Sequence, residues 1–250
     1  MVADRSKTVL TPPKVHLSEE LLQLAKKTSS ATISGTLSKM GFRFVYMAGV
    51  LPVRAGTVMT GRAYTLRLLP AREDHWQQGE ERAKYAQHIA IESIGSGDVL
   101  VVDARGNTKA GIFGDRLIAR MKSRGAEGLV TDGAIRDIPY LRTFDFPCFI
   151  RAPHGYGHTQ EHWAMDVQLP IACGGVTVYP GDLIVGDDDG VVMCPQGIAE
   201  RVIQESIAQE EEESFTRELL EQGYSVNDVH GKLPPKLQAE YEEWRRKKGI

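Results

Sequence analysis

The chain has 250 residues, of which 42% are hydrophobic and 25% charged, and its formal net charge is −3. This is the composition of an ordinary globular protein, and the slight negative charge gives no electrostatic reason to expect nucleic-acid binding. Three cysteines without a C-x-x-C pair argue against a disulfide framework or a zinc knuckle, and no apolar run reaches the roughly 20 residues of a membrane span.

The first predicted elements are an N-terminal arm and two helices. Residues 1–17 contain Pro12-Pro13 and little periodicity, which indicates an arm, and they lack the basic-then-apolar layout of a signal peptide. We therefore expect a cytoplasmic protein. Ser18 is a good N-cap for the first helix, and a second helix is predicted across residues 30–40, ending at Gly41.

A stretch of β-forming residues and a third helix come next. Residues 50–69 alternate in polarity, which predicts a hairpin or a strand pair, and residues 71–79 are polar and predict a loop. A helix is expected over residues 80–94. Gly97-Asp98 then leads into an apolar run that ends at Asp103, as in a strand buried on both faces.

The stretch from Gly111 to Pro139 contains the most chemistry. Gly114-Asp115 opens a helix with apolar residues at helical spacing, which Gly125 ends. Residues 128–131 predict a short buried strand, closed by a turn at Asp132-Gly133. Such a helix and such a strand have similar lengths of roughly 15 Å and run in opposite directions. We therefore expect Asp115 and Arg136-Asp137 to lie along the same edge of a sheet.

That edge combines an anion site with hard oxygen ligands. The free N–H groups of Asp115, Arg116 and Leu117 at the helix start suit a carboxylate or phosphate, and Arg136 adds a planar two-pronged donor. Asp115 and Asp137 suit Mg²⁺ or Mn²⁺, which take few protein ligands and keep several waters. We favour a site for a small acid that chelates a metal over the simpler alternative, a capping Asp115 and a surface ion pair.

A histidine-rich segment carries a second motif. His158, Glu161 and His162 fit the H-x-x-E-H pattern of inverted zinc peptidases, which requires a helix. Because glycines precede the motif and a strand-like run follows it, we interpret the match as chance. The loop from His154 to Trp163 remains a candidate border of the pocket or of a subunit contact.

The chain after Pro195 is predicted to be helical, with one apolar stripe and an acidic run at Glu210–Glu213. We divide the chain into the arm, a domain over residues 18–222 and an extension over residues 223–250.

Several motifs together resemble one family. G-D-x20-R-D at Gly114-Asp115 and Arg136-Asp137 is similar to the signature of the RraA-like family, which includes class II 4-hydroxy-4-methyl-2-oxoglutarate/4-carboxy-4-hydroxy-2-oxoadipate aldolases. The resemblance extends to Gly97-Asp98 through Asp103, Cys173-Gly174-Gly175-Val176 and Pro180-Gly181-Asp182. It implies an α/β fold, a layered ββα swivelling domain with N-terminal helices and a C-terminal helical extension, assembled as a trimer or hexamer with sites between subunits.

The resemblance also implies roles for individual residues. It assigns catalysis to Arg136, Asp115, Glu213 and His88. It assigns substrate binding to Gly114, Asp115, Arg116, Leu117 and Arg136. Asp137 becomes the direct ligand of Mg²⁺ or Mn²⁺, and Asp115 mainly holds coordinated water. Glu213 matches a glutamate that reaches a neighbouring subunit's site, although a plain charged helix face explains it equally well. For His88, a helix-face histidine without a partner is the alternative.

The implied activity is cleavage of a 4-hydroxy-2-oxo acid to pyruvate and a carbonyl product, with oxaloacetate decarboxylation as a side activity. Gly35 and Lys84 depart from the aldolase pattern, where an acid and an asparagine are usual, so a sugar-derived 2-oxo acid is an equal alternative. The other alternative is a non-catalytic regulator that binds an RNA-degrading endonuclease. The retained Asp137 favours the enzyme, since such regulators lack the metal-binding aspartate after the arginine.

Overall fold

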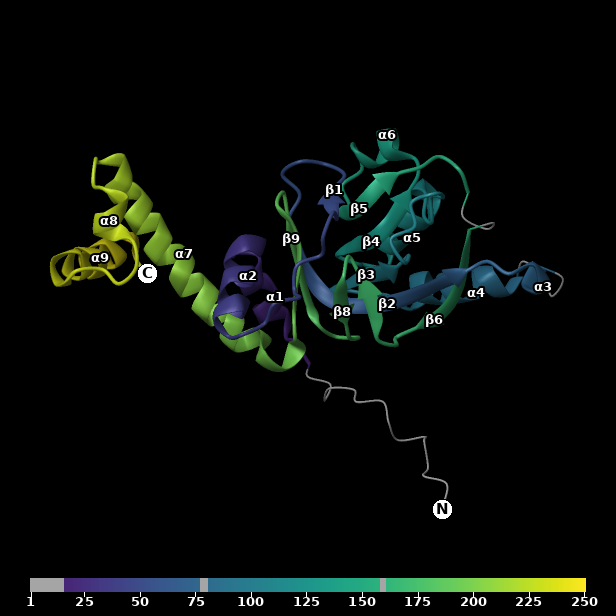
Figure 1. Cartoon of the computed structure of the whole chain (residues 1–250), viewed down its shortest axis with the longest axis horizontal. Helices are drawn as coiled ribbons and strands as arrows, with labels where there is room; N and C mark the ends of the chain where they lie inside the picture. Colours follow the sequence, from purple (N-terminus) through teal and green to yellow (C-terminus); the bar gives the residue numbers. More distant parts are fainter. Residues whose placement is uncertain (1–15, 77–80, 158–160) are drawn as a thin grey trace, which may run out of the picture. The chain divides into compact units, whose positions relative to one another are not determined.

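The computed structural model describes residues 16–76, 81–157 and 161–250 of the chain (Figure 1). It divides into two compact units, the first ending at Ile203 and the second running from Gln204 to Ile250. The predicted arm lies almost entirely outside the described residues.

A mixed eight-stranded sheet is the frame of the first unit. Its order is β1 (Leu51–Pro52), β5 (Cys148–Pro153), β4 (Gly128–Ile135), β3 (Asp98–Asp103), β2 (Met59–Pro70), β9 (Leu183–Asp187) and β10 (Gly190–Cys194), while β6 (His162–Val167) also pairs with β2. The four strands from β5 to β2 are parallel, and the remaining pairs are antiparallel. A separate hairpin joins β7 (Ile171–Cys173) to β8 (Val176–Val178). The predicted α/β fold is confirmed.

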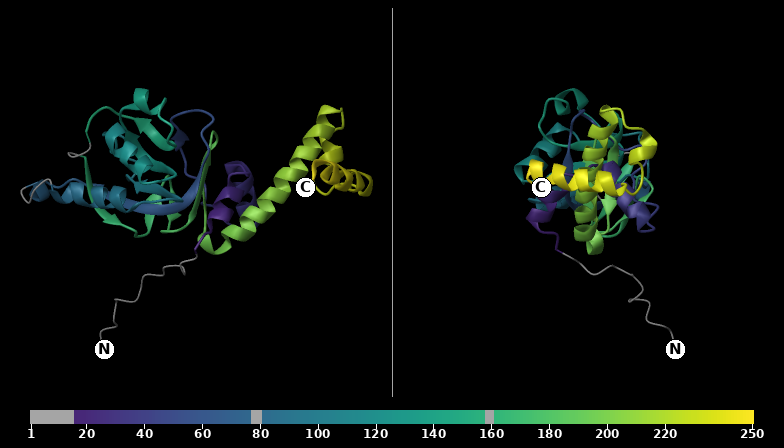
Figure 2. Two further views of the ribbon diagram at one scale, coloured as in Figure 1. Left: turned by 180° about the vertical axis from the view of Figure 1, so that it is seen from behind. Right: turned by 90° about the vertical axis from the view of Figure 1, so that its left-hand side faces the viewer.

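The helices of this unit begin where the sequence provides caps. Ser18 Oγ accepts the N–H of Leu21 at the start of α1 (Glu19–Ala25), and Ser29 Oγ accepts the N–H of Thr32 at the start of α2 (Ser30–Lys39). Both N-terminal helices were predicted. Figure 1 shows α2 beside β9, whereas α5 (Asp115–Ser123) lies beside β4. Seen from behind in Figure 2, α4 (Glu81–Ser93) runs along β6.

The main core lies between α4, α5 and the parallel strands. Its members are fully or almost fully buried and include Ile91 and Ile94 of α4, Leu100 of β3, Ile118 of α5 and Leu129 of β4. Every residue of β4 is buried, as expected of a parallel strand covered on both faces. This packing fixes the start of α5 against the end of β4.

Three local predictions are wrong. Residues 50–69 form no hairpin, because β1 pairs with β5 while β2 pairs with β3, β6 and β9. Asp132-Gly133 is no turn but part of β4. The Asp132 carboxylate accepts the N–H groups of Ala104 and Gly106, and a Cβ on residue 133 would lie 2.5 Å from the Cβ of Ala104. Asp132-Gly133 therefore allows β4 to pack closely against the segment that follows β3. The segment predicted as a loop also contains a short helix, α3 (Glu73–Trp76).

The second unit is helical and has its own small core. It contains most of α7 (Ala199–Glu221), then α8 (Val226–Val229) and α9 (Pro235–Lys248). Its buried cluster is Phe215, Leu219, Val229, Leu233, Leu237 and Tyr241. The predicted C-terminal helical extension is confirmed. Among the described residues, every helix is too short or too polar to cross a membrane.

Candidate functional site

A cavity of about 660 Å³ opens where α5 begins, at the carboxyl ends of the parallel strands. Ligands of open α/β sheets bind at this end of the strands. Its lining residues are Gln87, His88, Gly111, Ile112, Gly114, Asp115, Arg116, Leu117, Arg136 and Gly157. Six of the seven side chains or backbone positions predicted for catalysis and substrate binding therefore share one cavity, since Glu213 is the exception.

The chain before α5 is held against the end of β4 by backbone hydrogen bonds. Ile112 N–H donates to Ala134 O at 2.8 Å, and Arg136 N–H donates to Phe113 O at 3.0 Å. Gly114 is the N-cap of α5 and makes no side-chain cap. A Cβ at Gly114 would lie 2.3 Å from Asp137 Oδ2 and 2.8 Å from Arg136 Nε, so any larger residue would displace these side chains.

Asp137 occupies the centre of this contact. Its backbone is left-handed, with φ of 63°, a conformation that an aspartate tolerates better than most residues. Its Oδ2 accepts the N–H of Asp115 at 3.1 Å and lies 3.4 Å from Arg136 Nε. The N–H of Arg116 donates to Asp115 Oδ1 at 2.7 Å. The prediction of three free N–H groups is therefore wrong for two of them, because the neighbouring carboxylates accept them.

The guanidinium of Arg136 offers donors to the cavity. Its side chain is 47% exposed, and Nε makes its ion pair with Asp137. Within the described part of the chain, the two Nη atoms have no protein partner, so they are available to a carboxylate in the cavity. Arg116 is exposed at the same rim and adds a second positive charge.

The donor set suits a hard divalent cation. Asp137 Oδ2 is engaged, but its Oδ1 has no protein partner among the described residues. No group of three or more His, Cys, Asp or Glu side chains is placed to hold a metal in the described ranges. Zinc sites require such groups, whereas Mg²⁺ is held by one or two carboxylates and keeps its waters. Asp137 and Asp115 therefore fit Mg²⁺ or Mn²⁺ better than zinc.

Two residues of α4 complete the wall of the cavity. His88 is exposed and borders the cavity, as expected of a pocket histidine. Gln87, which precedes it, was not predicted. It is 2% exposed, and its Nε2 donates to Ile112 O at 2.8 Å. The sequence gives no signal for it, because a glutamine in a helix shows its partner only when the fold brings the two together.

The remaining candidates are not among the residues that line this cavity, or they lie outside the described residues. Glu213 belongs to the second unit, where it is exposed and its Oε1 accepts the amide of Gln209 at 2.7 Å. His158 lies outside the described residues. Glu161 lies in a turn and His162 is the first residue of β6. Because neither residue is on a helix, they do not have the arrangement that the zinc-peptidase motif requires.

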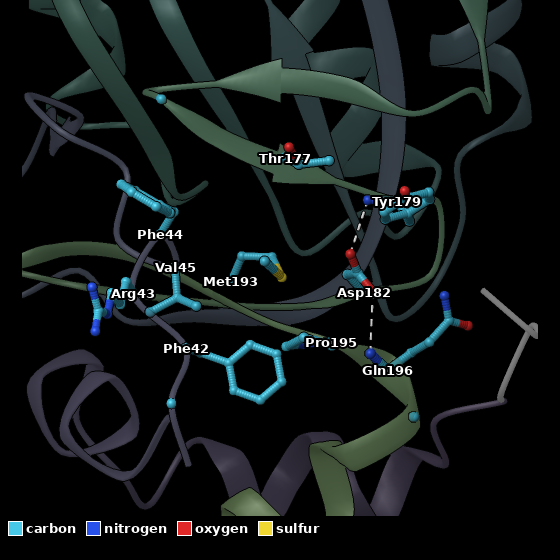
Figure 3. A pocket seen from close by; sticks show the side chains of 13 residues that line it. Phe42, Arg43, Phe44, Val45, Thr177, Tyr179, Asp182, Met193, Pro195 and Gln196 are labelled. Atoms are coloured by element: carbon cyan, nitrogen blue, oxygen red, sulfur yellow. Dashed lines mark hydrogen bonds between the residues drawn. The ribbon is translucent and has the colours of Figure 1, made fainter. Parts of the chain in front are cut away.

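A larger cavity of about 930 Å³ lies elsewhere in the first unit (Figure 3). Phe42, Phe44 and Met193 line it, and its buried carboxylate is Asp182. Burial raises the pKa of Asp182, and its two oxygens accept the N–H groups of Tyr179 and Gln196. Because these bonds anchor the turn before β9, the carboxylate has a structural role and the cavity carries no comparable chemistry.

The chain is similar to several known proteins. The model of the RraA-like family, described as Aldolase/RraA, matches residues 30–193. A relative from Halalkalibacterium halodurans, provisionally named 4-hydroxy-4-methyl-2-oxoglutarate aldolase, is 41% identical over 117 residues, which are 47% of this chain and 55% of the relative. Protein DlpA of Legionella pneumophila is 29% identical over 81% of this chain but only 33% of its own length. The chain thus spans about half or less of these two relatives.

A solved structure matches over a longer range. Streptomyces coelicolor RraAS2, described as an unusual member of the RNase ES inhibitor RraA protein family, is 34% identical with a TM-score of 0.74. The match covers 82% of this chain and 99% of that one.

Proposed function

Because the chain belongs to the RraA-like family, we propose that it is a divalent-metal-dependent lyase that cleaves a 4-hydroxy-2-oxo acid to pyruvate and a carbonyl product. One observation carries the proposal. The start of α5 and the Arg136-Asp137 pair meet at Gly114, so that Asp115 and Arg136 line one cavity and the Asp137 carboxylate contacts both of them.

Arg136 is the proposed carboxylate receptor. Its two Nη atoms form a planar fork that matches the two oxygens of the substrate carboxylate. Asp137 holds the guanidinium through Nε and so limits its rotation. Arg116, exposed at the rim, lowers the free energy of a second negative charge on the substrate.

Asp137 and Asp115 are the residues that would hold Mg²⁺ or Mn²⁺. When bound, the cation stabilises the negative charge that develops on the ketone oxygen of the substrate. A lysine Schiff base is then unnecessary.

Cleavage breaks the C3–C4 bond and requires two proton transfers. The 4-hydroxyl loses its proton to a base as C4 becomes a carbonyl, and the electron pair remains on the pyruvate enolate. C3 of the enolate then takes a proton. We assign the first transfer to Asp115 and the second to His88, both of which line the cavity. Glu213 of a neighbouring subunit remains part of the proposal, as does a trimeric or hexameric assembly.

The same enolate forms when oxaloacetate loses CO₂, so decarboxylation is proposed as a side activity. A regulator of an RNA-degrading endonuclease is the second candidate, because Streptomyces coelicolor RraAS2 is described as a member of an RNase ES inhibitor family. Asp137 favours the enzyme: among the described residues its Oδ1 has no protein partner and can bind a cation, whereas a binding surface alone has no need of such a ligand.

The test is a panel of 2-oxo acids incubated with the purified protein and Mg²⁺, with pyruvate release coupled to lactate dehydrogenase. The panel includes sugar-derived acids as well as 4-hydroxy-4-methyl-2-oxoglutarate. We expect Arg136→Ala to remove a charged hydrogen-bond pair of about 1.5–3 kcal/mol and to slow turnover by roughly ten- to a hundredfold. Asp137→Asn preserves the left-handed backbone and removes the negative charge, so it should abolish both activities. Wild-type rates of decarboxylation in Asp137→Asn, above the free-metal background, would refute the shared site.

A further inference from the structure

A buried amide forms part of the cavity wall without a role in the proposed reaction. Gln87 is 2% exposed, and its Nε2 donates to Ile112 O at 2.8 Å. A carbonyl oxygen accepts and never donates, so this bond fixes which end of the amide faces Ile112. The Oε1 of Gln87 takes no part in this bond. Among the described residues it has no protein donor, although Gln87 lines the cavity.

The peptide that Gln87 holds is part of the reactive loop. Ile112 N–H donates to Ala134 O at 2.8 Å, and the next carbonyl, that of Phe113, accepts the N–H of Arg136 at 3.0 Å. The bond from Gln87 is thus the tie from α4 to a loop that β4 holds on its other side. Because Gly114 and Asp115 follow directly, the amide has a fixed position relative to the carboxylates.

Because the position of Gln87 Oε1 is fixed, this acceptor favours a substrate that carries a hydrogen-bond donor. The lining offers positive charges from Arg116 and Arg136 to the carboxylates of a substrate. An amide oxygen repels a carboxylate but accepts a hydrogen bond from a hydroxyl group. Sites that bind a hydroxyl through a buried polar group reject analogues without it, because the group is then left unpaired.

We propose that Gln87 is a specificity-determining residue, whose Oε1 accepts a hydrogen bond from a hydroxyl group of the 2-oxo acid as the substrate binds, before that proton passes to Asp115, while its Nε2 stays on Ile112. This inference rests on the proposed function and extends it to the choice of substrate. It assigns the site to a hydroxylated 2-oxo acid, which oxaloacetate is not. Oxaloacetate therefore binds without this bond.

The experiment compares two activities in one set of variants. Gln87→Met keeps the length of the side chain and removes both polar atoms. We expect its kcat/KM for cleavage of a 4-hydroxy-2-oxo acid to fall about tenfold more than its kcat/KM for oxaloacetate decarboxylation, mainly through KM. Ile89→Met is the matched control in the same helix, since Ile89 is partly exposed and is not among the lining residues, and both of its activities should be unchanged.

A purely structural amide gives a different pattern. If Gln87 only ties down the loop at Ile112, both activities of Gln87→Met fall by the same factor, and the inference is overturned. If that variant does not fold, Gln87→Asn applies the same test, because its amide is one methylene too short to serve both partners. A wild-type protein without either activity would overturn the proposed function instead, which separates the two failures.

Discussion

Gly114 gives the sharpest test of the site because its replacement acts through distance alone. Its φ of −129° is accessible to any residue, so alanine causes no backbone strain there. The added Cβ would lie 2.3 Å from Asp137 Oδ2, where ordinary contacts begin near 3.4 Å. The carboxylate, or α5 itself, must therefore move by about 1 Å.

A displacement of that size is small for the fold and large for the chemistry. A misplacement of about 1 Å costs roughly a hundredfold in rate, or about 2.7 kcal/mol of transition-state stabilisation. The side chains of Arg136 and Asp137 are 47% and 37% exposed, so they have room to shift toward solvent. The free energy of unfolding should then fall by only about 1 kcal/mol, at the low end for added methyl groups.

The assay pairs pyruvate release with thermal unfolding followed by circular dichroism. Gly95→Ala is the matched control, because its Cβ meets no atom within 4 Å and Gly95 lies outside the cavity lining. We expect a loss of about a hundredfold in kcat/KM for Gly114→Ala, a fall in Tm of only a few degrees, and little change for Gly95→Ala. Wild-type turnover in Gly114→Ala would show that the spacing of Asp137 and α5 does not matter to the reaction.

Three further predictions concern the metal, the thiols and the core. Treatment with EDTA followed by desalting should abolish turnover and added Mg²⁺ should restore it, so undiminished turnover in protein shown to be metal-free by elemental analysis would contradict the metal requirement. Burial raises the pKa of Cys148 and Cys194 to about 12, so iodoacetamide at pH 8 should label them only after unfolding; rapid labelling of the native protein, read by mass spectrometry, would contradict this burial. Phe149→Ala should lower the free energy of unfolding by about 3–5 kcal/mol in urea titrations because Phe149 is fully buried, and a loss below about 1 kcal/mol would show that the site collapses around the smaller side chain.

The assembly prediction completes the set and is tested by light scattering. A site that borrows Glu213 from a neighbour requires an oligomer, for which a ring of three is the expected unit. A fully active monomer of 27.6 kDa would contradict it.

The sequence predicted those parts of the site that depend on local pattern. Gly114-Asp115 and Arg136-Asp137 are joined by one helix and one strand, and the lengths of these elements alone bring the pairs together. Asp132-Gly133 has the composition of a turn. It lies in a strand because distant N–H groups, those of Ala104 and Gly174, donate to its carboxylate, and no local rule contains that information.

Long-range pairing explains the other errors. The partner of β1 is β5, which arrives almost a hundred residues later, so the polarity pattern of residues 50–69 could not reveal it. The role of Gln87 could not be predicted for a similar reason, since its partner, the carbonyl of Ile112, follows a whole strand later in the chain. The alternation of a strand predicts its faces, but its neighbours depend on the whole chain.

The position of β2 in the sheet has a consequence for synthesis on the ribosome. One edge of this strand pairs with β3, which follows it closely, but the other edge is shared by β6 and β9. Those strands are completed roughly 110 residues after β2 ends, which at about 5–20 residues per second is a delay of about 5–20 s. During that interval the nascent chain exposes an unpaired, mostly apolar strand edge, which makes it a substrate for chaperones and a seed for aggregation when translation stalls.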